Sequence, residues 1–91
     1  MKKAGKIKDN EVAMVHASSF ALKILKKVPH LQSEEIIKKV LPFIEAEKMS
    51  QELEIFAIAA VNGVIKMRHE HNDLSDREII ERVVRELKKT G

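Results

Sequence analysis

Cysteine, tryptophan and tyrosine are absent from this 91-residue chain, and phenylalanine occurs only three times. Without cysteine there can be no disulfide framework, no thiolate metal site and no thiol nucleophile, which favours a cytoplasmic protein. Because aromatic residues make up only 3% of the chain, the core must be built from Ile, Val, Leu, Ala and Met. Side chains of this kind suit packed helices better than a β-sandwich.

Glycine occurs only at positions 5, 63 and 91, which excludes a glycine-rich loop that could cradle phosphate. The sequence also lacks an HExxH motif and the spacing of a nucleophilic triad. The longest nearly apolar run, residues 55–65, is far shorter than the ~20 residues that cross a bilayer. No apolar signal segment follows the N-terminal lysines. We therefore expect a soluble protein that is not an enzyme, needs no cofactor and has no membrane partner.

Positive charge is concentrated at the N-terminus, although the formal net charge of the chain is only +3. Residues 1–8 contain four lysines, namely Lys2, Lys3, Lys6 and Lys8. We expect residues 1–8 to form a flexible basic arm and residues 9–91 to form a single helical domain. Such an arm either keeps the protein soluble or contacts phosphates of a nucleic acid.

The second half of the chain resembles the first at an offset of 43 residues. When residues 9–48 are laid over residues 52–91, eight of the forty pairs are identical. The longest matching stretch pairs Glu35, Ile36 and Ile37 with Glu78, Ile79 and Ile80. A repeat of this length is typical of a helical hairpin. The alternative is that two amphipathic helix pairs resemble each other through composition alone.

Four helices are predicted, each beginning at a residue that can cap free backbone N–H groups. The expected starts are Asp9 or Asn10, Ser33, Ser50, and Ser75, which forms a capping box with Glu78. Pro29 ends the first helix, and Pro42 predicts a kink or an early end of the second near Leu41. Because the loops are short, we expect an all-α, compact four-helix bundle built from two tandem hairpins, 9–48 and 52–91.

The third predicted helix is unusually apolar, and this is the feature with most bearing on function. Its best candidates for contact with another protein are Ile55, Ala59, Asn62, Gly63 and Lys66. Two explanations compete. Either this helix is the enclosed centre of the monomer, or its apolar stripe meets another chain, most simply a second copy of the protein.

Three histidines are the only candidates for a metal site. His69 and His71 lie at the end of the third helix, and His30 lies in the loop after the first. A divalent ion needs three or four converging ligands, and residues two apart point to different sides of a helix. The alternative is that these histidines are solvated, and sequence does not decide between the two.

The function predicted by elimination is a small, non-enzymatic protein-interaction or regulatory module, with itself or another protein as partner. The alternative is a nucleic-acid-binding accessory protein. It would use the basic arm and the lysine-rich end of the first helix, that is Lys2, Lys3, Lys6, Lys8, Lys23, Lys26 and Lys27.

Overall fold

The computed structural model describes residues 9–90, which form four α-helices and no β-strand. The helices are α1 (Asn10–Lys27), α2 (Ser33–Ala46), α3 (Gln51–Glu70) and α4 (Asp76–Thr90). The prediction of an all-α four-helix bundle is confirmed. The basic arm, with Lys2, Lys3, Lys6 and Lys8, lies outside the described residues.

Three of the four helices begin at the caps that the sequence predicts. Asp9 caps α1, where its Oδ1 accepts hydrogen bonds from the backbone N–H groups of Glu11 at 2.7 Å and Val12 at 3.2 Å. Ser50 caps α3 by accepting from the N–H of Leu53 at 3.2 Å. These bonds satisfy backbone donors that have no partner inside the helix.

The capping box at the start of α4 is formed in both directions. The N–H of Glu78 donates to Ser75 Oγ, and the N–H of Ser75 donates to Glu78 Oε1, each at 3.1 Å. The predicted cap at Ser33 is wrong, because Ser33 is already the first residue of α2. The cap position belongs to Gln32, whose side chain makes no capping hydrogen bond.

Pro42 lies inside α2, which continues to Ala46. The expected early end near Leu41 is therefore wrong. Because proline has no N–H group, the carbonyl oxygen of Lys38 loses its helical hydrogen-bond donor. Lys38 is exposed, so water can donate to this carbonyl instead. The chain leaves the helix through Lys48, which has a positive φ of 55°.

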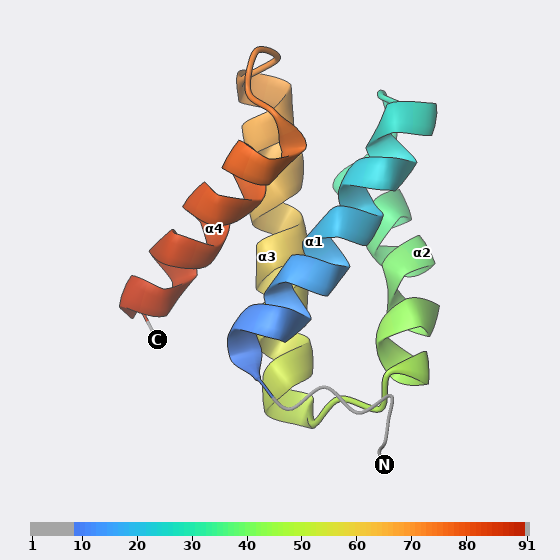
Figure 1. The fold of residues 1–91 in the computed structure, drawn as a ribbon. Coiled ribbons are helices and arrows are strands. Elements are labelled where there is room, and N and C mark those ends of the chain that lie inside the picture. Colours follow the sequence, from blue (N-terminus) through green and yellow to red (C-terminus); the bar gives the residue numbers. More distant parts are fainter. Residues whose placement is uncertain (1–8, 91) are drawn as a thin grey trace.

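The central pair of the bundle is α1 and α3, which cross each other and run in the same general direction (Figure 1). They make the most extensive contact between any two helices. Alanines explain this contact, since Ala17, Ala21, Ala57 and Ala60 are fully buried and let the backbones approach closely. Both α1 and α3 also contact α2 and α4, whereas α2 and α4 do not contact each other within the described chain.

Burial repeats at the 43-residue offset that the sequence shows. Seven pairs of equivalent positions are buried in both halves. The pairs are Met14/Ala57, Ala17/Ala60, Ser18/Val61, Ala21/Val64, Leu22/Ile65, Ile36/Ile79 and Val40/Val83. This agreement supports tandem hairpins, although true duplication of a hairpin stays a prediction.

Candidate functional site

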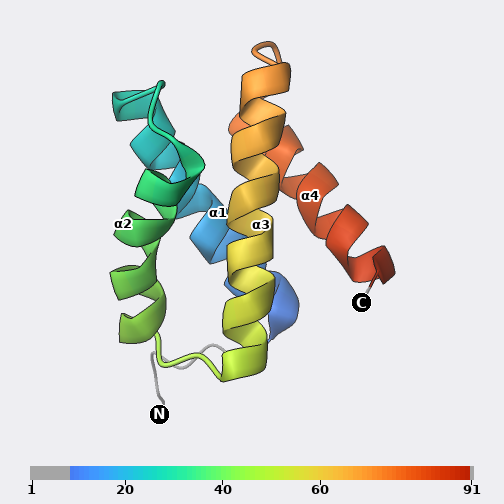
Figure 2. The ribbon, with the colours of Figure 1, turned by 180° about the vertical axis from the view of Figure 1, so that it is seen from behind.

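The outward face of α3, defined by Ile55, Ala59, Asn62 and Lys66, is open to solvent. Figure 2 shows the reason: α3 lies at the front, with α2 on one side, α4 on the other and α1 behind it. No helix of the described chain covers this side of α3, because α2 and α4 remain apart. Ile55 keeps 65% of its surface exposed, the most of any large hydrophobic residue of the described chain.

The other members of this face become more polar toward the C-terminal end of α3. Ala59 is half-buried, and Asn62 and Lys66 are exposed. The four residues are spaced by four, three and four positions, so they lie on one side of the helix. Half-buried Ile58 widens the apolar part of this surface.

Gly63 makes a close contact inside the monomer. A Cβ atom at Gly63 would lie 2.8 Å from Cγ1 of Val83 on α4. Gly63 therefore permits the close approach of α4 inside the monomer. We remove Gly63 from the candidate contact residues and keep Ile55, Ala59, Asn62 and Lys66.

The equivalent face of α1 carries the second exposed apolar residue. Val12 is 42% exposed and lies 43 positions before Ile55. The α1 stripe is more polar at its second position, where His16 stands in place of Ala59, whereas its last position is a lysine in both helices, Lys23 and Lys66. The two faces are matched in position and differ in chemistry, which makes Val12 a natural control for Ile55.

A charged network that we did not predict lies at the end of the bundle where α1 and α3 finish and α4 begins. Nη2 of Arg68 is 2.5 Å from Oδ1 of Asp76, and Nζ of Lys26 is 3.6 Å from the other oxygen of that carboxylate. Nη1 of Arg68 also donates to the carbonyl oxygen of Leu74 at 2.8 Å. One signal of this network was present in the sequence. At the 43-residue offset, Arg68 is the equivalent of the apolar Leu25, so a charged residue stands where the first half has a core residue.

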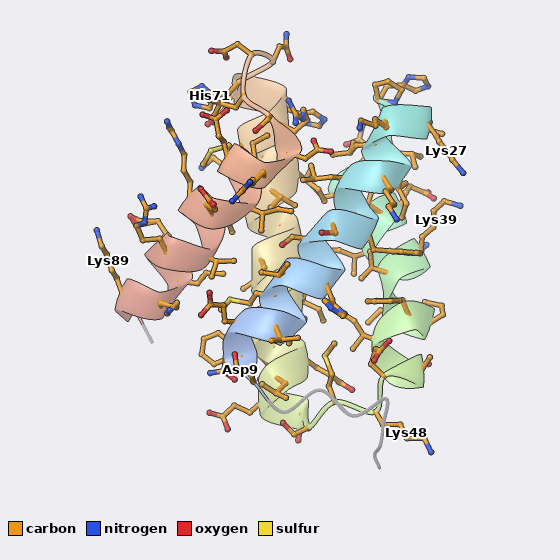
Figure 3. The ribbon with its side chains drawn as sticks, viewed as in Figure 1. Asp9, Lys27, Lys39, Lys48, His71 and Lys89 are labelled. Atoms are coloured by element: carbon orange, nitrogen blue, oxygen red, sulfur yellow. The ribbon has the colours of Figure 1, made fainter. Side chains whose placement is uncertain are left out.

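Three lysines of the nucleic-acid alternative fall within the described residues, and all three lie on the surface. Lys23, Lys26 and Lys27 are exposed near the C-terminal end of α1. Lys27 and Lys39 lie on the same side of the molecule, whereas Lys89 lies on the opposite side (Figure 3). Lys26 is less available than its neighbours because it pairs with Asp76.

The three candidate metal-binding histidines are all exposed. His69 lies in the last turn of α3, His71 caps that helix, and His30 lies in the loop between α1 and α2. Residues 9–90 contain no group of three or more histidine, aspartate or glutamate side chains arranged to hold a metal ion.

Comparisons with protein-family models, with curated proteins and with solved structures gave no match for this chain. In the part of the chain that the structure describes, no helix combines the length and apolar character needed to cross a bilayer.

Proposed function

We propose that this protein is a non-enzymatic helical interaction module that forms a symmetric homodimer through the outward face of α3. The observation that carries the proposal is the exposure of Ile55 on a face that α2 and α4 leave uncovered. Covering most of one exposed isoleucine contributes about 1–2 kcal/mol. A symmetric dimer gains this contribution twice, because each copy presents the same face.

The charges on α3 favour an antiparallel arrangement of the two copies. Glu52 and Lys66 are both exposed and lie seven residues before and after Ala59, which is about two helical turns. If Ala59 lies at the dimer axis, Glu52 of each copy faces Lys66 of the other. The small side chain of Ala59 lets the two helices approach at the point where they cross.

The first experiment measures sedimentation of the wild-type protein and of Ile55→Arg over a range of concentrations. We expect the wild type to dimerise in the micromolar range and Ile55→Arg to stay monomeric with unchanged helical content. Val12→Arg is the matched control, because it introduces the same charge at the equivalent position of α1, and we expect it to dimerise normally. A wild-type protein that is monomeric at every concentration would refute the dimer.

A charge exchange tests the antiparallel arrangement itself. Lys66→Glu places an acid opposite Glu52 and should weaken the dimer. Adding Glu52→Lys to the same chain restores opposite charges and should recover most of the lost affinity. If the double variant dimerises no better than Lys66→Glu alone, the copies do not meet in this register.

The lysine-rich side gives the alternative, a nucleic-acid-binding accessory protein, some support. Lys23, Lys27, Lys38 and Lys39 are all exposed on α1 and α2. Binding of a labelled oligonucleotide would weaken steeply with salt. It would also suffer more from Lys23→Gln/Lys27→Gln than from Lys88→Gln/Lys89→Gln at the other side of the molecule. Absence of salt-sensitive binding to both DNA and RNA would close this alternative.

We also propose that the protein has a regulatory role and lies in the cytoplasm. The cytoplasmic location is supported by the lack of cysteine in the chain.

A further inference from the structure

A cavity of about 810 Å³ opens where the C-terminal ends of α1 and α3 meet the start of α4. Its apolar lining includes Leu22 and Leu25 of α1 and Leu74 of the loop before α4. This volume lies within the range of about 300–1,000 Å³ in which small-molecule sites usually fall. The cavity shares no residue with the outward face of α3, so an inference from it goes beyond the proposed dimer.

The charged residues around the cavity are mostly cationic. Lys26, Arg68 and Arg77 line it together with His69, and Asp76 is the single acid among the lining residues. Asp76 is shared between Arg68 and Lys26, as the network above shows. Arg77 pairs with Glu81 only at 3.4 Å, through a side chain that is 87% exposed. The rim therefore keeps an excess of positive charge.

Arg68 is the fixed part of this rim. Its side chain is only 23% exposed. Its guanidinium bonds to the carbonyl oxygens of His71 and Leu74 and to the carboxylate of Asp76. Lys26 and Arg77 are exposed, and their ion pairs with Asp76 and Glu81 are long, at 3.6 and 3.4 Å. Both side chains can therefore turn toward a ligand while Arg68 holds the wall of the cavity in place.

Part of the backbone at the start of α4 is already engaged within the helix. The capping box of Ser75 and Glu78 already satisfies N–H groups there. An anion in the cavity would be held by the side chains of Lys26 and Arg77, and this makes the site testable by substitution at exposed positions.

We propose that this cavity binds a small amphipathic anion, namely a medium-chain aliphatic carboxylate. The alkyl chain would lie on half-buried Leu74 and on the edges of Leu22 and Leu25 that line the cavity, and the carboxylate would face Lys26 and Arg77. A charged hydrogen bond between a cation and a carboxylate is stronger than a neutral one. The site therefore prefers the carboxylate to an alcohol of the same length, and it repels an alkylammonium ion.

The test is titration of the full-length protein with octanoate, followed by calorimetry and by backbone amide chemical shifts. Octan-1-ol and octylammonium are the ligand controls. The variant is Lys26→Gln/Arg77→Gln, and its matched control is Lys27→Gln/Arg82→Gln. The control removes the same two charges from exposed neighbours on the same helices that do not line the cavity. Circular dichroism establishes that both variants are folded.

We expect saturable octanoate binding with shifts at Leu25 and Leu74, and a loss of affinity of about tenfold in Lys26→Gln/Arg77→Gln. The matched control should stay within about twofold of the wild type. Any of four results overturns the proposal: no saturable binding of octanoate, equal binding of octan-1-ol, equal losses in the two variants, or shifts confined to residues outside the cavity.

Discussion

Gly63 of α3 and Val83 of α4 approach so closely that a Cβ atom at position 63 would lie 2.8 Å from Cγ1 of the valine. Val83 is 6% exposed, and its branched side chain has little rotational freedom in a helix. A glycine inside a helix costs about 1 kcal/mol relative to alanine. The contact with Val83 gives this glycine a structural reason, because only a residue without a side chain permits it.

We therefore expect Gly63→Ala to lower the free energy of unfolding by about 1–2 kcal/mol, although alanine is the better helix former. Val83→Ala removes the obstructing methyl groups and should cost about 1–2 kcal/mol by itself. Urea denaturation followed by circular dichroism measures both changes.

The double variant distinguishes a clash from a general intolerance of position 63. In Gly63→Ala/Val83→Ala the new methyl group occupies space that the valine has left. The double variant should therefore lose less stability than the sum of the two single losses, by at least about 0.5 kcal/mol. Additive losses would show that Val83 is not what limits the residue at position 63.

Ser18 is fully buried in α1, and its hydroxyl has no hydrogen-bond partner in the described structure. Its repeat equivalent is the apolar Val61, which is also buried. Ser18→Ala should raise the free energy of unfolding by about 1 kcal/mol, because it removes an unsatisfied polar group and improves helix propensity. Ser19→Ala is the control, because it makes the same change in helix propensity at a half-buried neighbour and removes no buried, unpaired hydroxyl. Equal effects of the two substitutions would contradict a burial penalty at Ser18.

Lys48 adopts a positive φ of 55° just after α2 ends. Glycine takes this conformation without the steric cost of a side chain, and it is the residue that most often follows the end of a helix. Lys48→Gly should therefore raise the midpoint of thermal unfolding, with a gain of about 0.5–1 kcal/mol. The same substitution at exposed Lys39 inside α2 should lower stability by about 1 kcal/mol. Two losses of similar size would show that the conformation at Lys48 carries no strain.

Asp76 joins three helices, because it is on α4 and pairs with Arg68 of α3 and Lys26 of α1. Its side chain is only 35% exposed. Asp76→Asn keeps the shape and removes the charge, and we expect chemical denaturation to show a loss of about 1–2 kcal/mol. Glu81→Gln breaks the more exposed pair with Arg77 and should change stability by less than about 0.5 kcal/mol. A comparable loss of stability in both variants would mean that the ion pairs of Asp76 stabilise the fold no more than an exposed pair does.

The helices and their order could be predicted from sequence because their signals are local. Asp9, Ser50 and the pair Ser75 and Glu78 act as caps in the structure as the sequence indicates. The same reasoning failed at Ser33 and Pro42. At Pro42 the outcome depends on which side of α2 faces water, and a proline rule does not contain that information. At Ser33 the helix begins one residue earlier than the capping rule places it.

The exposure of the candidate contact face could be predicted in part, while its role in contact stays a prediction. The spacing of Ile55, Ala59, Asn62 and Lys66 placed them on one side of a helix, and the structure leaves that side uncovered. Gly63 could not be separated from them by sequence, because its neighbour Val83 is 20 residues away along the chain. The network around Arg68 was missed for the same reason, since it depends on how three helix ends meet.

The absence of contact between α2 and α4 also determines how this molecule can open. Among the described helices, each of these outer helices contacts only α1 and α3, so detachment of one leaves the helix contacts of the other in place. Amide hydrogen exchange should then proceed through two separate partial openings, each at a lower cost than global unfolding. A binding partner could thus displace a single outer helix and expose part of the aliphatic interior while the rest of the protein stays folded.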